Sequence, residues 1–209
     1  MGEWTEAELE SLHDFFFELG LLKQLPRSGW FKAGITQPES IAEHSFRTAM
    51  IGFVLATLTE REVDPHRIAF YCLTHDLAEA RTSDLDWVAQ QYLEKEDYRN
   101  EEVLRDQIDP LPEKSGRELA HSLGLTSDFS EEDLNLIRDA DLLEAAFQGI
   151  AYVSSGHQLA KEWVESSVGL LKTRVGKMVG EQLQKRLEKE EAEDLVGWWK
   201  EYNFQEPSK

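Results

Sequence analysis

Apolar residues recur along most of the chain at the spacing of an amphipathic α-helix. The first such segment carries Leu9, Leu12, Phe16, Leu19 and Leu22. Alternating apolar and polar runs bounded by hairpin turn pairs, which are typical of β-strands, are missing from the sequence. The pattern therefore predicts an all-α protein. We expect helices over residues 6–22, 41–58, 64–80, 85–93, 111–123 and 158–187, and a further one that begins after Ser130.

Short polar signals mark where several of these helices begin. The capping-box pattern is a Ser or Thr followed three residues later by an acidic residue, which satisfies free N–H groups at a helix start. It occurs at Thr5–Glu8, Ser40–Glu43 and Ser130–Asp133. Asp64-Pro65 is a second kind of start signal, because Asp caps well and Pro suits the first helical turn.

No internal repeat and no long linker divides the 209 residues, so we expect one domain over residues 1–209. No apolar run approaches the ~18 residues needed to cross a membrane, and the acidic N-terminus is unlike a signal peptide. We therefore expect a cytoplasmic protein without a membrane association. Trp198 and Trp199 are expected to pack back onto the body. Cys72, the single cysteine, lies in an apolar run and is expected to be a buried structural thiol.

The net charge of -19 limits the classes of ligand. Such a surface repels phosphate backbones, so long nucleic acid is a poor partner. A small phosphorylated substrate remains compatible with it, because a metal and one arginine can reverse the field inside a pocket.

A paired histidine and aspartate, His75-Asp76, stands in an otherwise apolar helical segment. The neighbours Phe70, Leu73 and Leu77 make it costly to bury this pair without a partner. A divalent cation is one natural partner. For such a pair taken alone, a hydrogen bond within the core is the simpler alternative.

Two further residues complete a possible ligand set. His44 supplies a second imidazole from the helix expected over 41–58, and Asp141 supplies a second carboxylate from an apolar helical stretch. Two imidazoles and two carboxylates suit Mn, Fe, Co, Ni or Zn, and suit Ca less well. The sequence therefore predicts one divalent transition-metal site made by His44, His75, Asp76 and Asp141. Asp139 is left out, because it points to a different face of its helix.

The segments around these residues resemble the HD-domain superfamily of metal-dependent phosphohydrolases, and within it the 5'-deoxynucleotidase branch. The resemblance is carried by Pro26–Trp30, Pro38–Ser45, Leu73–Ala80 and Asp139–Glu144. It covers about residues 15–192, which leaves a tail at about 193–209. It implies a compact helical bundle, a homodimer, and a Mn- or Co-supported hydrolysis of (deoxy)nucleoside 5'-monophosphates.

The same resemblance implies two catalytic carboxylates, Glu79 and Asp84. Glu79 follows His75 by one helical turn, where it would orient a water molecule or act as a base. Asp84 would protonate or position the leaving 5'-oxygen. The alternatives are a surface carboxylate for Glu79 and an N-cap of the helix expected from Leu85 for Asp84.

Arg27 and Trp30 are the expected substrate contacts. A guanidinium can grip two phosphoryl oxygens at once, so Arg27 is the candidate phosphate clamp. Trp30 would stack on or wall off the sugar or base, although a core aromatic that anchors its loop is the alternative. Ser28-Gly29 separates the two residues here, as in eukaryotic and archaeal relatives, whereas they are adjacent in bacterial members.

Two competing functions stay open at this stage. HD proteins also cleave cyclic nucleotides, (p)ppGpp and nucleoside triphosphates, although the chain shows no second catalytic or sensory domain. A non-catalytic scaffold that holds its metal for stability is the other alternative. The presence of Glu79, Asp84 and Arg27 disfavours the scaffold, since a structural metal site needs none of them.

Overall fold

The structure is a computed structural model that describes residues 4–93, 100–188 and 197. Within these residues it is built from helices, and no strand forms beyond an isolated bridge between Pro26 and Ser40. The all-α prediction is confirmed. The elements in chain order are α1 (Glu6–Leu19), η1 (Gly20–Lys23), η2 (Ser28–Ala33), α2 (Ile41–Leu58), α3 (Pro65–Thr74), α4 (Glu79–Thr82), α5 (Trp87–Gln90), α6 (Asn100–Ile108), α7 (Glu113–Ser122), α8 (Glu131–Ser154), α9 (Ala160–Gly169) and α10 (Arg174–Leu187), where η1 and η2 are 3₁₀ helices.

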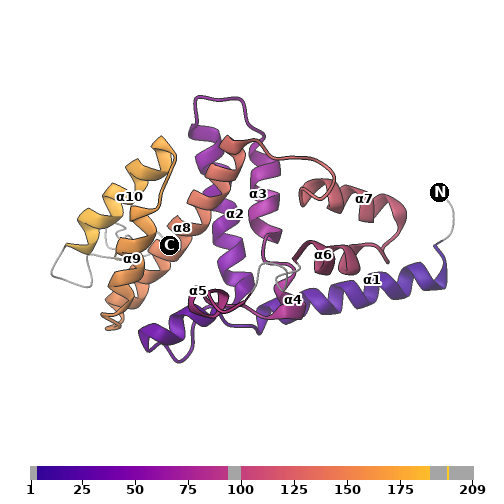
Figure 1. Ribbon diagram of the computed structural model, residues 1–209, viewed down its shortest axis with the longest axis horizontal. Coiled ribbons are helices and arrows are strands. Elements are labelled where there is room, and N and C mark those ends of the chain that lie inside the picture. The colour runs from indigo at the N-terminus through magenta and orange to yellow at the C-terminus, as the bar shows by residue number, and fades with distance from the viewer. Residues whose placement is uncertain (1–3, 94–99, 189–196, 198–209) are drawn as a thin grey trace, which may run out of the picture.

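Helices α2, α3 and α8 form the centre of the molecule (Figure 1). Their facing side chains make one large apolar core that includes Ile68, Cys72, Leu136 and Leu143. Helix α2 approaches α3 so closely that a Cβ atom on Gly52 would lie 2.8 Å from Cys72 Sγ. Cys72 is buried and free, as predicted.

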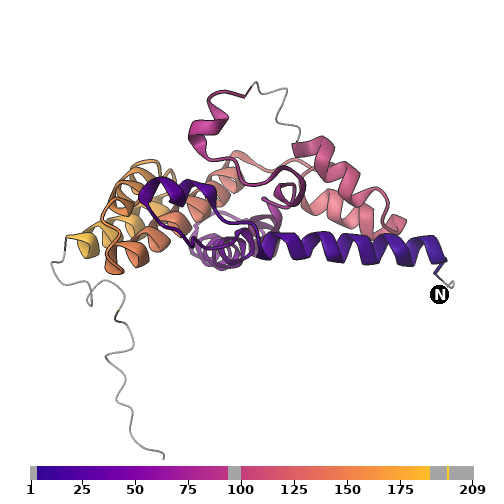
Figure 2. The same ribbon diagram turned by 90° about the horizontal axis from the view of Figure 1, so that it is seen from below.

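The remaining helices extend the centre in two directions. In both views α9 and α10 lie at one end of the molecule, and α6, α7 and the start of α1 lie at the other (Figures 1 and 2). A second, smaller apolar cluster joins residues of α6 and α7 with Leu77 and Ala78, and apolar side chains of α1 pack against it. Leu77 and Ala78 therefore attach the turns after α3 to this second cluster.

The predicted start signals are confirmed. Thr5, Ser40 and Ser130 each accept a hydrogen bond from the backbone N–H three residues on, and each forms a complete capping box. Asp64 caps α3 by accepting from the N–H groups of His66 and Arg67, with Pro65 in the first turn.

The predicted helix ends are less accurate. The helix expected over 64–80 stops at Thr74, so His75 and Asp76 lie in turns after α3 rather than inside a helix. The helix expected over 158–187 is divided into α9 and α10 by residues 170–173. The helix over 85–93 shrinks to the single turn of α5, and 6–22 becomes α1 followed by η1.

Some expectations fall on parts of the chain that the structure leaves undescribed. The packing of Trp198 and Trp199 and the tail at 193–209 lie outside the described residues. Among the helices of the described residues, none is long and apolar enough to cross a membrane.

Candidate metal centre

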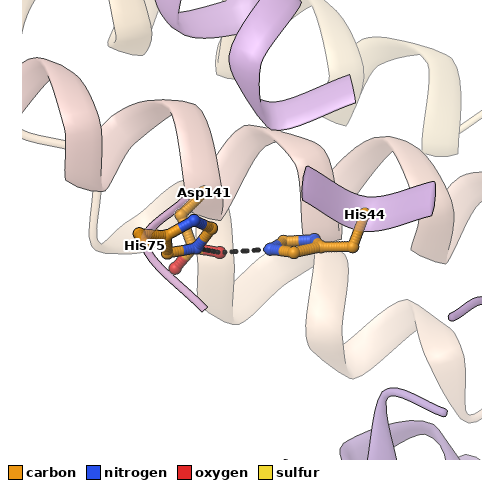
Figure 3. Close-up of side chains that lie close together, drawn as sticks. All are labelled: His44, His75 and Asp141. Atoms are coloured by element: carbon orange, nitrogen blue, oxygen red, sulfur yellow. Dashed lines mark ion pairs between the residues drawn. The ribbon is translucent and has the colours of Figure 1, made fainter. Parts of the chain in front are cut away.

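Three segments far apart in the chain bring the predicted ligands together. His44 lies near the start of α2, His75 and Asp76 follow α3 directly, and Asp141 lies in α8. Figure 3 shows His44, His75 and Asp141 converging on one point. Their ligand atoms all lie within 4.8 Å of one another, which is the spacing of a possible metal site.

The individual distances support this grouping. Asp141 Oδ1 lies 3.2 Å from His44 Nε2 and 3.9 Å from His75 Nε2. Asp76 reaches the same imidazoles, with Oδ2 3.6 Å from His44 Nε2 and Oδ1 3.3 Å from His75 Nε2. Ligands of one ion with bonds of about 2.1 Å are expected roughly 3 Å apart, so the four residues stand near that geometry.

The hydrogen bonds of the two imidazoles decide which nitrogen faces the cluster. His75 Nδ1 lies 2.8 Å from Cys72 O. A carbonyl oxygen only accepts, so Nδ1 carries the hydrogen and Nε2 keeps a free electron pair. His44 Nδ1 lies 2.5 Å from the Glu144 carboxylate, which fixes His44 in the same way. In their neutral forms both imidazoles would therefore offer the Nε2 electron pair to an ion placed between them and the carboxylates, and the set fits a borderline metal ion.

The Glu144 carboxylate is a functional residue that the sequence interpretation missed. It is fully buried on α8, and Arg47 Nε donates to its other oxygen over 2.9 Å. Burial raises the pKa of Glu144, but the charges and hydrogen bonds of His44 and Arg47 outweigh burial and lower it. Arg47 is held in turn by Gln148 Oε1 at 2.6 Å. The signal in the sequence was a charged residue inside the apolar run Leu142–Ala146.

Arg27 sits directly against the two carboxylates of the cluster. Its Nη1 lies 3.3 Å from Asp76 Oδ2 and its Nη2 lies 3.8 Å from Asp141 Oδ1. Burial lowers the pKa of Arg27, but the negative charges of Asp76 and Asp141 outweigh burial and raise it, so the guanidinium stays charged. Burial also opposes ionisation of Asp141, yet the hydrogen bond to His44 and the charge of Arg27 hold its pKa well below the usual range.

Glu79 occupies the first position of α4 and lines the same cavity. It is 6% exposed, and its Oε2 has no hydrogen-bond partner among the described residues. Burial raises its pKa, and the charges of Asp76 and Asp84 raise it further, to about 8. A carboxyl group with a pKa near neutrality can take up or release a proton during a reaction. The surface-carboxylate alternative is therefore wrong, since the side chain is buried.

Asp84 also lines the cavity, and its Oδ2 accepts a short hydrogen bond from the backbone N–H of Ser28. It does not cap a helix: α5 begins at Trp87 and is capped by Asp86, so the N-cap alternative for Asp84 is wrong. The preceding residue, Ser83, has φ 63° and ψ 162°, a backbone conformation that residues other than glycine rarely adopt. This unusual turn directs Asp84 back towards η2.

Trp30 is almost completely buried, with 3% of its surface exposed. Its Nε1 donates to Glu39 Oε1 over 3.1 Å, and its ring packs against Tyr152 and Trp163 at centroid distances of 5.0 and 5.8 Å. These contacts are those of the core-anchor alternative. Trp30 also lines the cavity, so its ring contributes to the cavity wall.

Asp139 lies away from the cluster, as expected. Its buried carboxylate accepts from the backbone N–H groups of Lys172 and Thr173 and from the Thr173 hydroxyl, at 2.8, 2.7 and 2.6 Å. These bonds hold residues 172 and 173, which lie between the end of α9 and the start of α10. They account for the break in the helix that the sequence pattern predicted as continuous.

Comparison with known proteins identifies the class of this protein. The HD domain family model matches residues 19–183, so the chain belongs to the HD domain family. The assignment to the phosphohydrolases of this superfamily, made from the motifs, is thereby confirmed at the level of the family.

Particular relatives agree with this class. A protein of Dictyostelium discoideum named 5'-deoxynucleotidase HDDC2 is 30% identical over 152 residues, which are 70% of this chain and 80% of the relative. The Homo sapiens protein of the same name is 26% identical over 161 residues, 76% of this chain and 78% of the relative. Among solved structures, the PH0347 protein of Pyrococcus horikoshii superposes with a TM-score of 0.65 and 28% identity, covering 83% of this chain and 96% of that one.

Proposed function

We propose that this protein is a divalent-metal-dependent 5'-deoxynucleotidase, which hydrolyses deoxynucleoside 5'-monophosphates to nucleoside and phosphate. The observation that carries the proposal is that one cavity of about 280 Å³ is lined by Arg27, by the buried Glu79 and by three of the four predicted metal ligands. The names of the relatives support the same substrate class.

The residues present fit a divalent transition metal. His44 and His75 would each supply Nε2, and Asp76 and Asp141 would each supply a carboxylate oxygen. A bound ion of this kind supplies Lewis acidity, which activates water and neutralises phosphoryl charge. This donor set suits Mn, Co, Fe, Ni or Zn.

Arg27 would bind the phosphoryl group. Its two terminal nitrogens already lie against Asp76 and Asp141, so the guanidinium is held beside the place where the ligands meet. The rigid fork of a guanidinium suits two oxygens of one phosphoryl group. Arg27 would also offset the negative field of the acidic protein within the cavity.

Glu79 and Asp84 would handle the protons. The raised pKa of Glu79 lets it accept a proton from the attacking water near neutral pH. Asp84 lies on the same cavity wall, next to the N-terminus of η2, and would position the leaving 5'-oxygen. Trp30, fixed by its core contacts, would limit the space beside the sugar.

The deciding experiment measures phosphate release from deoxy- and ribonucleoside 5'-monophosphates in the presence of Mn, Co, Zn or Mg. We compare the wild type with Asp76→Ala, with Glu79→Ala and with Glu165→Ala, a control at an exposed position on α9. Metal-dependent release that disappears in the first two variants and persists in the control is the expected result.

Two other outcomes correspond to the alternatives. One outcome is that no monophosphate releases phosphate while cyclic nucleotides, (p)ppGpp or triphosphates are hydrolysed. The proposed metal site would then stand, and the substrate class would change to these nucleotides. Absence of any hydrolysis, in a protein that binds metal tightly and unfolds when it is removed, would favour the scaffold.

A homodimer is part of the proposal, and an exposed apolar stripe on α2 supports it. Phe46, Met50, Val54 and Leu58 follow one another at four-residue spacing and are 66, 52, 47 and 60% exposed. A stripe of this length on a helix of a monomer is unfavourable in water, and a second copy of the chain would cover it.

The oligomeric state tests this part separately. The double variant Met50→Glu, Val54→Glu should elute as a monomer in size-exclusion chromatography with light scattering, where the wild type elutes as a dimer. Leu159→Glu, at a similarly exposed position (55%) just before α9, is the matched control and should leave the dimer intact. A monomeric wild type would contradict the proposal.

We further propose that residues 1–209 act as a single domain with its core at about 15–192, since the family model spans both apolar cores. A cytoplasmic location belongs to the same proposal, because free nucleotides are intracellular metabolites.

A further inference from the structure

The cavity that contains the predicted metal ligands is lined by side chains of two kinds. One group, Arg27, His75, Asp76 and Asp141, suits a phosphoryl group and a cation. The other group, Leu85, Trp87 and Gln90, comes from α5 and the turn before it. A volume of about 280 Å³ is near the lower limit of small-ligand sites, so one nucleotide is the largest unit it would enclose.

Trp87 is exposed although it lines this cavity. It is 62% exposed, whereas the other two tryptophans of the cavity wall, Trp30 and Trp163, are packed against each other. The indole of Trp87 therefore offers exposed aromatic surface to the cavity. Planar aromatic ligands stack on such a face, and nucleobases of every kind have a π-face to present.

The position of Trp87 is fixed by contacts of the preceding residue, Asp86. Asp86 caps α5, with Oδ1 accepting from the N–H groups of Val88 and Ala89 at 2.9 and 3.1 Å. The other oxygen of Asp86 forms an ion pair with Lys32 of η2. Because η2 begins directly after Arg27, this ion pair ties the start of α5 to the segment that carries the phosphate clamp.

Gln90 adds a polar group beside the exposed indole. Its Nε2 donates to Leu85 O over 2.7 Å, which holds the side-chain amide in place. The amide oxygen is then available as an acceptor for an amino group of a base. An aromatic face and a fixed acceptor together match the two features of a nucleobase, its ring plane and its polar edge.

We propose that Trp87 stacks on the base of the substrate and that Gln90 accepts from the base edge, so that the site selects nucleoside 5'-monophosphates over phosphomonoesters without a base. This inference rests on the proposed function and names the part of the site that recognises the nucleoside. Stacking does not depend on base identity, so purine and pyrimidine substrates should both benefit.

The test compares a deoxynucleoside 5'-monophosphate with 2-deoxyribose 5-phosphate, which lacks the base, in the metal-loaded full-length protein. Trp87→Ala should raise KM for the nucleotide by about 5- to 100-fold, the range for loss of one base stack. It should leave KM for 2-deoxyribose 5-phosphate and both kcat values within about twofold. Trp87→Phe should recover most of the nucleotide affinity, because a phenyl ring also stacks.

Trp4→Ala is the matched control, since Trp4 is 54% exposed and precedes α1 rather than lining the cavity. An unchanged nucleotide KM in Trp87→Ala would overturn the inference, and so would an equal loss on both substrates. Conversion of a dimer to a monomer by Trp87→Ala, with KM unchanged, would assign the indole to a subunit contact instead.

Failure of the proposed function is recognised separately. If the wild type releases no phosphate from any substrate, calorimetric binding of the same nucleotide replaces KM as the readout. Weaker binding by Trp87→Ala than by wild type and Trp4→Ala would then support the base contact without catalysis. Equal binding by all three proteins, or none by the wild type, would overturn it.

Discussion

At the scale of single residues, the site depends on buried ionisable groups that shift one another's pKa. Burial and acidic neighbours raise the pKa of Glu79 to about 8, whereas His44 and Arg47 keep Glu144 ionised in spite of its burial. The two carboxyl groups have the same chemistry in isolation. Their surroundings give one the capacity to move a proton and the other the task of holding an imidazole.

Replacing Glu79 by glutamine should change both activity and the pH dependence of stability. The loss of the proton acceptor should reduce kcat by about 10²- to 10⁴-fold. The folded-state pKa of about 8 is above the ordinary value, so the folded protein binds more protons than the unfolded chain between pH 4.5 and 8. Stability therefore falls as pH rises through this window, by up to about 1.4 kcal/mol per pH unit.

Urea unfolding of the metal-free proteins at pH 5, 6.5 and 8 measures this effect. The wild type should lose more unfolding free energy from pH 5 to pH 8 than Glu79→Gln, by about 2 kcal/mol when partial access of water is allowed for. Parallel pH profiles for the two proteins would show that Glu79 titrates normally in the fold.

Replacing Glu144 by glutamine should weaken metal binding. The carboxylate holds His44 Nδ1 at 2.5 Å and so aims Nε2 at the cluster, which makes Glu144 a positioning residue. Loss of such a partner usually costs about 10- to 100-fold in metal affinity. Isothermal titration with Mn or Co, and the visible spectrum of the Co form, report the change independently of turnover.

The controls for this prediction are Glu165→Gln, which should bind as the wild type does, and Glu144→Asp, which should recover part of the affinity. A Glu144→Gln protein with unchanged metal affinity and an unchanged Co spectrum would remove the positioning role.

At the scale of helices, the close contact of α2 with α3 sets the distance between the two imidazoles. Gly52→Ala places a Cβ atom 2.8 Å from Cys72 Sγ and 3.3 Å from Ile68 Cγ2, so α2 and α3 must separate. Overpacking of this kind costs about 1–3 kcal/mol. We expect a lower free energy of unfolding and, because His44 and His75 move apart, weaker metal binding.

A second substitution tests whether the contact with Cys72 causes the loss of stability in Gly52→Ala. Cys72→Ala removes the sulfur atom that the new methyl group meets, so the double variant should recover part of the loss in a double-mutant cycle. Gly20→Ala is the control, because nothing lies within 4 Å of a Cβ there and φ is -61°. Additive losses in the cycle would show that the two positions do not share a contact.

Helix starts were predictable from the sequence and several helix ends were not, for a physical reason. The caps at Thr5, Ser40 and Ser130 act on N–H groups three residues away, so the signal is local. The break at 170–173 depends on Asp139, more than thirty residues earlier in the chain. A pattern of spacing within 158–187 carries no information about that contact.

The candidate site shows the same division. The four predicted metal ligands were identified because histidine and aspartate stood in apolar stretches of sequence, and the structure brings all four together. The partner of His44 was missed, because the sequence does not indicate that Glu144 on α8 faces α2. The surroundings of Trp30 were also undecided in the sequence, since its burial depends on Tyr152 and Trp163.

At the scale of the whole molecule, the net charge of -19 opposes a dianionic substrate. Only the cavity, with Arg27 and a bound cation, attracts it. Salt screens the long-range repulsion more than the short contacts inside the site. Raising KCl from about 20 to 200 mM should therefore lower KM for a nucleoside monophosphate by a few-fold, with little change in kcat.

Steady-state kinetics at fixed metal concentration measure this dependence, and sodium chloride distinguishes ionic strength from a specific effect of potassium. A KM that rises with salt would show that local attraction to the cavity outweighs the charge of the molecule.

The scattering of the metal ligands over α2, the turn after α3, and α8 has a consequence during synthesis of the chain. Asp141 leaves the ribosome long after His44 and Asp76, so a growing chain has an incomplete set until α8 has been made and docked. The complete set of four ligands therefore exists only once α8 is in place. Selection of the metal then depends on which ions are available at that moment and on the fit of a preformed cluster, rather than on capture by the nascent polypeptide.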